Sequence, residues 1–414
     1  MIMSIKRVSS KKLSFQSFIV RFMDSLPLRI SPTALEKNSI TVDDSKEKVI
    51  LLILRDLIRL NWSVSFESER IVVSPPDTYD KSVIKQSMAV RREEVIKDNI
   101  QWIDNHIDLA RTNLVDGTDA INSKIRPIIE VCRTQKQHDL FRILRYYWSS
   151  PYSEYVGRRI KLIVRDSALP GCPVIGIAAL GSPIIHIPER DDWIGWDKDT
   201  RTQNLNFAMD AYVVGAMPPY NYLLGGKLVS YVLASSEVRK IFENKYASTT
   251  YNRLAGMFTT SLYGRSSQYN RLRTKDRLLY QPIGSTRGFG TLHLTNETFV
   301  AMNDYLRSQN VIVGNRFGDG PSWTMRVIRS AGRILGFDAD FLLRHSFKRS
   351  IYFISLAHGS KEFLRGETTA LRNYSSTLNT LSNYWKRRWL KNRLLRAEVI
   401  EKVKTFQKED FDVR

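Results

Sequence analysis

A glycine pair followed by a lysine is the first group of residues whose types and spacing could bind a ligand. The group lies in PPYNYLLGGKLVSYVL, and its members are Tyr222, Gly225, Gly226 and Lys227. Backbone N–H groups at the start of a helix point outward, and glycines let an anion approach them closely, so the group is a candidate phosphate site. The spacing matches neither a P-loop nor a dinucleotide-binding fingerprint. The alternative is a close strand–helix contact that requires small residues, and the pattern leaves both open.

A second glycine-rich group lies in IGSTRGFGTLHL, at the end of an expected strand. Its candidate anion-binding residues are Gly284, Thr286, Arg287 and Gly288. Glycines and hydroxyls at a strand end can bind phosphate or can form a bulged turn. Both interpretations stay open.

Two tryptophans and neighbouring carboxylates form a third group, in RDDWIGWD. Its members are Asp191, Asp192, Trp193 and Trp196. Carboxylates bind divalent cations and aromatic rings stack on bases, but adjacent residues of a strand point to opposite faces. We therefore favour a structural turn anchored by the tryptophans. No metal is predicted, since the six histidines form no HExxH motif and the two cysteines cannot complete a four-cysteine zinc site.

Arginines interleaved with tyrosines make up a candidate nucleic-acid-binding segment, LYGRSSQYNRLRTKDRL. The residues singled out there are Arg265, Tyr269, Arg271, Arg273, Lys275 and Arg277. Arginine forks suit phosphates and tyrosine rings offer stacking surfaces, a combination that single-strand binders use. A solvated basic helix face is the alternative.

A second basic segment, NYWKRRWLKNRLLRAEVIEKVKTF, is expected to form one amphipathic helix over Asn383–Phe406. Trp385 and Trp389 are four residues apart and therefore share a face. The candidate nucleic-acid-binding residues of this helix are Arg387, Arg388, Lys391 and Arg393. We expect the helix to contact a polyanion or an acidic partner rather than to close the core. A solvated amphipathic helix is the alternative.

The net charge of the chain points to the same kind of partner. Its 414 residues carry 63 Lys+Arg against 42 Asp+Glu, a formal net charge of +21, and residues 201–414 hold 33 of the basic and 16 of the acidic side chains. A basic half beside a nearly neutral half is typical of proteins that bind polyanions, because each neutralised phosphate releases counterions. We predict DNA or RNA as the partner, bound without strong sequence preference.

Apolar periodicity divides the chain into four regions. We expect a helix and a hairpin over 1–78, long helices over 79–149, an α/β core over 150–292 and a basic helical region over 293–414. Pro127 is expected to divide a helical stretch that runs from about Asp119 to Trp148. No apolar run has the length of a membrane span, and the basic start lacks the apolar core of a signal peptide. With only two cysteines, the composition indicates a cytoplasmic protein that contacts no membrane.

The order of elements over 150–292 resembles the N-acetyltransferase (GNAT) fold, a mixed α/β sheet. A hairpin, a strand, a glycine-led helix, a strand, a short helix and a last strand follow one another. In that family the loop equivalent to Tyr222–Lys227 holds the pyrophosphate of acyl-coenzyme A. The resemblance implies, as an alternative to simple nucleic-acid binding, an acyltransferase or nucleic-acid-processing enzyme that uses this loop. The family's Gln/Arg-x-x-Gly-x-Gly/Ala motif reads Tyr-Leu-Leu-Gly-Gly-Lys here, so no cofactor is predicted.

The long motifs of the chain resemble the DruA family, from about residue 80 to the C-terminal WKRRWLKNR. They include RYYWSSPYSEYVGRRIKLIVRD, RDDWIGWD, SLYGRSSQYNRL and IGSTRGFGTLHL, together with the segment around the glycine pair. The resemblance implies a component of a Druantia antiphage defence system that works beside a large DruE helicase-like protein and accessory subunits. The resemblance implies no reaction that could be assigned to particular residues. No catalytic residue is therefore predicted, and whether the protein is an enzyme stays open.

Overall fold

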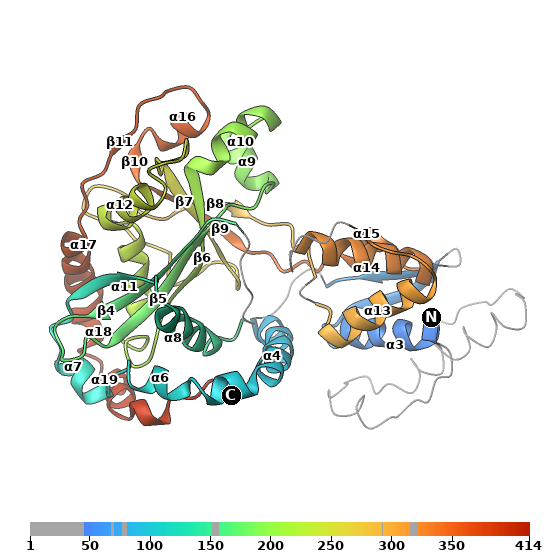
Figure 1. The fold of residues 1–414 in the computed structure, drawn as a ribbon, viewed down its shortest axis with the longest axis horizontal. Helices are drawn as coiled ribbons and strands as arrows, with labels where there is room; N and C mark the ends of the chain where they lie inside the picture. Colours follow the sequence, from blue (N-terminus) through green and yellow to red (C-terminus); the bar gives the residue numbers. More distant parts are fainter. Residues whose placement is uncertain (1–44, 68–69, 77–80, 151–156, 292, 315–320) are drawn as a thin grey trace, which may run out of the picture.

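A seven-stranded mixed sheet runs through the larger part of the structure (Figure 1). The computed structural model describes residues 45–67, 70–76, 81–150, 157–291, 293–314 and 321–414. In spatial order the strands are β3 (Pro127–Val131), β4 (Arg159–Asp166), β5 (Val174–Gly181), β6 (Ala208–Ala216), β7 (Gly256–Ser261), β9 (Ser350–Ser355) and β8 (Gln281–Ser285). Strands β6 and β7 pair in parallel, and the other neighbours pair antiparallel. The mixed α/β class expected from the sequence is confirmed.

Strand β4 is covered on both faces at its centre, which explains the apolar run over residues 162–164. Leu162 and Val164 pack into one layer, and Ile163 between them packs into the opposite layer. Because successive side chains of a strand point to opposite faces, a strand covered on both sides lacks polar alternation. The helices that cover the first face include α11 (Gly225–Leu233) and α12 (Ser236–Lys245), and those on the second include α6 (Ile107–Arg111) and α8 (Gln135–Tyr146).

Strand β3 corrects the expectation of helix on both sides of Pro127. This proline is the first residue of β3, which pairs with β4 at the edge of the sheet. Proline has no N–H to donate, so it suits the start of an edge strand as well as a break in a helix. Two helices flank the strand, α7 (Gly117–Asn122) and α8. The second begins at a capping box, in which the Thr134 hydroxyl accepts from the Gln137 backbone N–H.

Strand β9 lies within the region that was expected to be helical. It pairs with β7 on one side and β8 on the other, although a helical insertion separates it from β8 in the sequence. The sheet therefore draws on residues from both sides of position 292. The division of the chain at 78, 149 and 292 stays a prediction.

A smaller body combines the start of the described chain with the insertion before β9 (Figure 1). Its elements are α3 (Ser45–Ile58), β1 (Ser63–Glu67), β2 (Arg70–Ser74), α13 (Asn296–Ser308), α14 (Pro321–Leu335) and α15 (Ala339–Leu342). One apolar cluster joins Ile53 of α3 to Leu306 of α13 and Ile328 of α14. The buried Asp56 carboxylate accepts from both the backbone N–H and the hydroxyl of Thr295, the residue that caps α13. The helix and the hairpin expected before residue 78 are confirmed.

The C-terminal segment corrects the expectation of one long helix that stays off the core. It forms α17 (Leu378–Trp385), the π-helical turn η2 (Lys386–Leu390), α18 (Lys391–Arg393) and α19 (Ala397–Lys404). Trp385, Leu390 and Val403 are buried in the apolar cluster that also contains the side chains of α11. One face of the segment thus closes the core, because its apolar side chains pack against α11, β3 and α7.

Further elements complete the described chain. They include α4 (Lys81–Asp98), α5 (Ile100–Asp104), α9 (Pro188–Ile194), α10 (Lys198–Asn204), α16 (Ser360–Leu364) and the two-stranded pair of β10 (Ala357–His358) with β11 (Arg372–Asn373). Among the described residues, no helix has both the length and the apolar character that a membrane crossing requires.

Candidate nucleic-acid interface

The Lys227 ammonium group lies inside the protein, where it faces backbone carbonyls. Its Nζ donates to the carbonyl of Ser267 and lies 3.4 Å from the carbonyls of both Gln268 and Asn270. The Trp389 ring lies on another side, with its centroid 4.3 Å from Nζ. The lysine therefore holds the 267–270 loop and the C-terminal segment against α11. This geometry favours the packing alternative that the sequence left open for the glycine-led helix.

The glycine pair allows this close packing. A Cβ on Gly225 would lie 2.6 Å from the Tyr220 carbonyl oxygen, and one on Gly226 would lie 2.8 Å from Oε1 of Gln268. The C-terminal segment also covers the start of α11, because the Trp385 indole N–H donates to the Leu224 carbonyl at 3.2 Å. Small residues are needed here because neighbouring atoms already occupy the space around both Cα atoms.

Tyr222, the remaining member of this group, contacts the C-terminal segment through both its backbone and its ring. Its carbonyl accepts from Nε of Arg393 at 2.9 Å, and its ring centroid lies 4.8 Å from the Lys402 ammonium. Arg393 is thus occupied by a backbone carbonyl, whereas Arg387, Arg388 and Lys391 are exposed.

The two basic segments identified separately in the sequence meet beside Lys227. The Tyr231 hydroxyl donates to the Arg273 carbonyl at 2.9 Å and accepts from the Trp389 indole at 3.3 Å. Burial first, and then the positive charges of Arg271 and Arg388, lower the pKa of Lys227 to about 8. Four exposed side chains of these two segments make up what we call the Lys227 surface: Arg271 and Arg388, whose charges act on Lys227, and Arg273 and Lys391, which follow them closely in the sequence. Arg265, Lys275 and Arg387 are exposed in the same two segments.

Two other residues of the first basic segment belong to the core. The Tyr269 ring is buried, stacked on Tyr280 at 5.2 Å and edge-on to Tyr352 at 5.2 Å, so its faces contact protein rather than offering a platform for a base. Burial raises the pKa of Tyr269 to about 12. Arg277 donates to the Ser355 carbonyl at 3.0 Å and lies over the Tyr374 ring at 3.6 Å. Its guanidinium joins two parts of the fold.

The carboxylate–tryptophan group corrects the turn that we favoured from the sequence, because Asp191, Asp192 and Trp193 lie in helix α9, which ends with its C-cap Gly195 just before Trp196. Asp191 is buried and is surrounded by cations, with Arg190 at 2.6 Å and Arg201 at 3.0 Å, while Nδ1 of His186 lies at 2.8 Å. The Trp196 indole donates to the Leu364 carbonyl at 2.5 Å, and Trp193 packs on Phe353. Asp192 points to solvent and does not join this network. Across the described residues no cluster of three or more His, Cys, Asp or Glu side chains is arranged to bind a metal ion.

The second glycine group lies at the edge strand β8 and forms a bulged turn. The register between β8 and β9 shifts between Pro282 and Gly284. The Thr286 hydroxyl accepts from the Arg349 N–H at 3.1 Å, and Arg287 pairs with Glu189 of α9 at 3.1 Å. Gly288 is buried against the backbone of Ser346, where an added Cβ would lie 2.6 Å away. These contacts give each residue a structural partner and favour the turn over an anion site.

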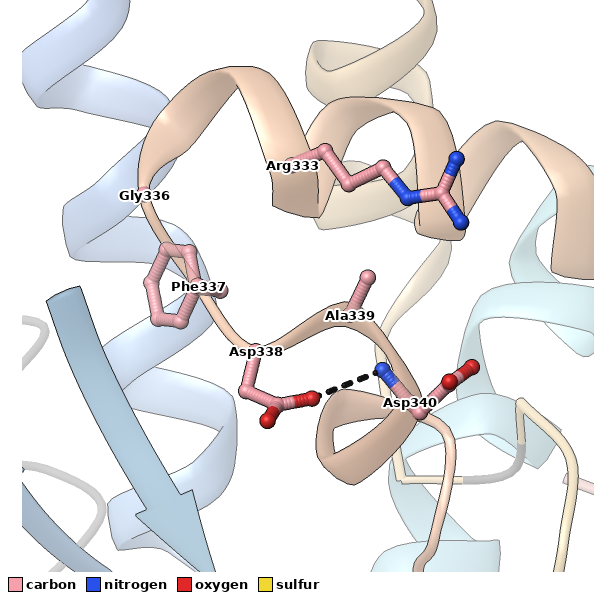
Figure 2. Close-up of a pocket in the computed structure, with 6 residues that line it drawn as sticks. All are labelled: Arg333, Gly336, Phe337, Asp338, Ala339 and Asp340. Carbon is pink, nitrogen blue, oxygen red and sulfur yellow. Dashed lines mark hydrogen bonds between the residues drawn. The ribbon is translucent and has the colours of Figure 1, made fainter.

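A shallow pocket of about 320 Å³ lies at the end of α14, in the smaller body, where the sequence suggested no site. Figure 2 shows that the Asp338 carboxylate there accepts from the Asp340 backbone N–H, which it does at 3.1 Å. Asp338 therefore caps α15, and Arg333 shares the pocket with two carboxylates. Its mixed charge does not select for a polyanion.

Comparison with known proteins decides the family. Residues 78–366 match the family model described as Druantia protein DruA. The chain is also similar to the Druantia protein DruA of Escherichia coli (strain UMEA 4076-1), with 35% identity over 296 residues, which cover 69% of this chain and 72% of that protein. The chain belongs to the DruA family. This membership confirms the resemblance identified in the sequence and makes the chain a component of Druantia antiphage defence.

The DruA match covers every strand of the large sheet and ends before α17. It therefore includes Arg271 and Arg273 of the Lys227 surface but not Arg388 or Lys391. No solved structure matches the chain. The resemblance to the GNAT fold accordingly stays a prediction, and the architecture is a mixed sheet with flanking helices.

Proposed function

We propose that this DruA-family chain is a nucleic-acid-binding subunit of a Druantia defence system and that it binds DNA or RNA through the Lys227 surface. The observation that carries the proposal is the convergence of two basic segments, more than a hundred residues apart, on either side of Lys227 and Trp389. Arginine and lysine side chains gathered on one surface neutralise successive phosphates of a nucleic-acid backbone.

The charges of this surface are not balanced from within the fold. In the described part of the chain, none of its four side chains is paired with a carboxylate. The lowered pKa of Lys227 has burial as its first cause and the neighbouring arginines as its second, so positive charge is concentrated there. A bound phosphate backbone would relieve that repulsion. Because the surface holds exposed cations rather than exposed rings, we expect it to bind the backbone and to read little sequence.

The acyltransferase alternative has less support. It requires an open cleft beside the Tyr222–Lys227 loop, in which a pyrophosphate could reach the start of α11. In this structure Gln268, Trp385 and Trp389 pack against that position. We also propose that the chain works beside other Druantia subunits, including the DruE helicase-like protein, and co-purification of the two proteins tests that association.

Fluorescence anisotropy with labelled single- and double-stranded oligonucleotides tests nucleic-acid binding. Six to ten phosphate contacts would reduce the affinity roughly 10³–10⁵-fold between about 50 and 200 mM salt. A variant with all four side chains of the Lys227 surface changed to Gln should bind more weakly, and its salt slope should be smaller by about one unit for each phosphate that it no longer neutralises.

The matched control removes four exposed lysines from helices away from the Lys227 surface. These are Lys81, Lys85 and Lys97 of α4 and Lys136 of α8. Both variants lower the net charge by four, so a general charge effect would weaken binding equally in the two. An equal loss, or a flat response of the wild-type protein to salt, would contradict binding through the Lys227 surface.

A further inference from the structure

Two stretches of chain join the large sheet to the smaller body, and they run antiparallel to each other. Residues 286–290 lead from β8 toward α13, and residues 343–349 lead from α15 into β9. The Ser346 N–H donates to the Gly288 carbonyl at 3.0 Å. Gly288 allows this close approach, because its φ is +69° and an added Cβ would lie 2.6 Å from the Ser346 backbone. We call the two stretches together the ribbon.

The ribbon has an inner and an outer face. In its second stretch His345 and Phe347 are buried, whereas Arg344 and Lys348 are exposed. Phe289 of the first stretch forms an antiparallel bridge with Arg344. Residues directly opposite each other in an antiparallel pair point to the same side, so Phe289 lies beside Arg344 on the outer face. That face therefore combines a ring with two cations.

A second phenylalanine lies on the other side of Arg344. Phe341 belongs to α15, and the guanidinium carbon of Arg344 lies 5.4 Å from the centroid of its ring. Among the aromatic side chains that the structure describes, Phe289 and Phe341 are the most exposed, at 47% and 39%. Two exposed rings next to one guanidinium offer apolar faces to a planar ligand that also carries negative charge.

The carboxylates of this region have partners of their own. Glu189 pairs with Arg287 of the ribbon at 3.1 Å, and Asp340 pairs with Arg329 of α14 at 3.3 Å. The Asp338 carboxylate accepts from two backbone N–H groups at the start of α15. The two cations of the outer face form no ion pair with a carboxylate of the described residues. They are therefore available to a negatively charged partner.

We infer that the ribbon binds single-stranded nucleic acid, with unpaired bases stacked on Phe289 and Phe341 and with phosphates held by Arg344 and Lys348. The inference rests on the proposed function, and it names the form of the nucleic acid and a contact that the Lys227 surface does not supply. Single-strand binders combine exposed rings with cations in this way, because every base has a face that can stack. The bases of a duplex already stack on one another, and inserting a side chain between them costs free energy.

Fluorescence anisotropy of the full-length protein with two single-stranded probes of equal charge tests the inference. One probe is a short oligothymidylate, and the other has the same backbone with abasic sites in place of the bases. We expect the wild-type protein to bind oligothymidylate about fivefold or more tightly than the abasic strand, since stacking of one base contributes a factor of roughly 5–140. Changing Phe289 and Phe341 together to Ala should remove this difference, because the affinity for oligothymidylate falls while that for the abasic strand and for duplex DNA stays the same.

The control changes two apolar side chains of similar exposure elsewhere, Ile128 of β3 and Val300 of α13, to Ala. It should bind both strands as the wild type does. A variant with Tyr in place of Phe289 and Phe341 keeps both rings and should still distinguish the two strands. Circular dichroism establishes that each variant is folded. Oligouridylate is the RNA probe, and weaker binding of the alanine variant to one polymer alone identifies which nucleic acid stacks on the rings.

The outcomes separate this inference from the proposed function. A wild-type protein that binds neither strand would contradict nucleic-acid binding itself, and the inference would fail with it. Binding that depends on salt but is equal for the two strands would contradict stacking alone. Stacking on these rings also fails if the alanine variant still distinguishes the strands. If that variant distinguishes the strands normally but no longer co-purifies with another Druantia subunit, the rings form a protein contact instead.

Discussion

The ammonium group of Lys227 lies 4.3 Å from the centroid of the Trp389 ring, so the glycine-led helix and the C-terminal segment meet through a cation–π contact. Arg388 lies over the same ring, with its guanidinium carbon 5.2 Å from the centroid. One of these cations faces inward to carbonyls, and the other is exposed. The contact therefore separates a structural lysine from the arginine that we propose binds phosphate.

We predict that Lys227→Met lowers the free energy of unfolding without weakening nucleic-acid binding. Methionine keeps the apolar stem but leaves the carbonyls of the 267–270 loop without their donor, which costs about 1–3 kcal/mol. Urea unfolding measures the first effect and anisotropy the second. Arg271→Gln is the control, since an exposed substitution should change stability by no more than about 0.5 kcal/mol while it weakens binding. A large loss of affinity in a stable Lys227→Met protein would instead indicate a direct phosphate contact.

A buried carboxylate predicts an unusual dependence of stability on pH. Burial raises the pKa of Asp210 to about 6, although the Ile184 N–H donates to it at 3.0 Å and Arg190 partly offsets the shift. Between about pH 4 and pH 6 the folded state then binds more protons than the unfolded state, so this group makes the free energy of unfolding fall as pH rises. Asp210→Asn removes that contribution. Urea titrations should show the stability of the variant relative to wild type rising over this interval and levelling above it, and a constant difference would contradict the assignment.

The sequence predicted those elements of the fold that depend on residues close together along the chain. The β4–β5 hairpin and the helix that begins at the glycine pair follow from local apolar patterns and turn residues. Pro127 gave an ambiguous signal, because a proline breaks a helix and also suits the first position of an edge strand. Strand β9 was missed because its partners β7 and β8 come from before the helical insertion, and no local pattern records that pairing.

The roles of individual site residues depended on contacts between distant segments. Tyr269 and Arg271 are two positions apart and looked equally available, yet Tyr280 and Tyr352 enclose the tyrosine while the arginine is exposed. Composition located the basic half of the chain, but it could not show that residues near 271 and 388 share one surface.

Docking of the C-terminal segment predicts a severe effect at one glycine. A Cβ on Gly117 would lie 1.6 Å from the Val403 carbonyl oxygen, so alanine at this position would force α19 away from α7. We expect Gly117→Ala to destabilise the protein by about 1–3 kcal/mol, as overpacking does. It should also speed tryptic cleavage after the exposed Arg396. Gly314→Ala is the control, since no atom lies within 4 Å of its added Cβ. Normal stability of Gly117→Ala would show that α19 does not dock as described.

We expect some arginines of the C-terminal segment to bind nucleic acid and another to stabilise the fold. Arg387 and Arg388 are exposed, whereas Arg393 donates to the Tyr222 carbonyl at 2.9 Å. Changing Arg387 and Arg388 to Ala should leave stability within about 0.5 kcal/mol of the wild-type value. The same change should reduce the salt slope of binding by about one unit for each phosphate that the two arginines neutralise.

Arg393→Ala should have the converse effect. Loss of its hydrogen bond to the backbone should lower the free energy of unfolding by about 0.5–1.5 kcal/mol and leave the salt slope unchanged. Thermal unfolding and anisotropy on the same preparations test both variants, and salt slopes taken at several protein concentrations distinguish weaker phosphate binding from a general loss of folded protein. If the Arg387/Arg388 variant unfolds earlier while it binds normally, these side chains support the fold, and the part of the Lys227 surface contributed by the C-terminal segment does not bind nucleic acid.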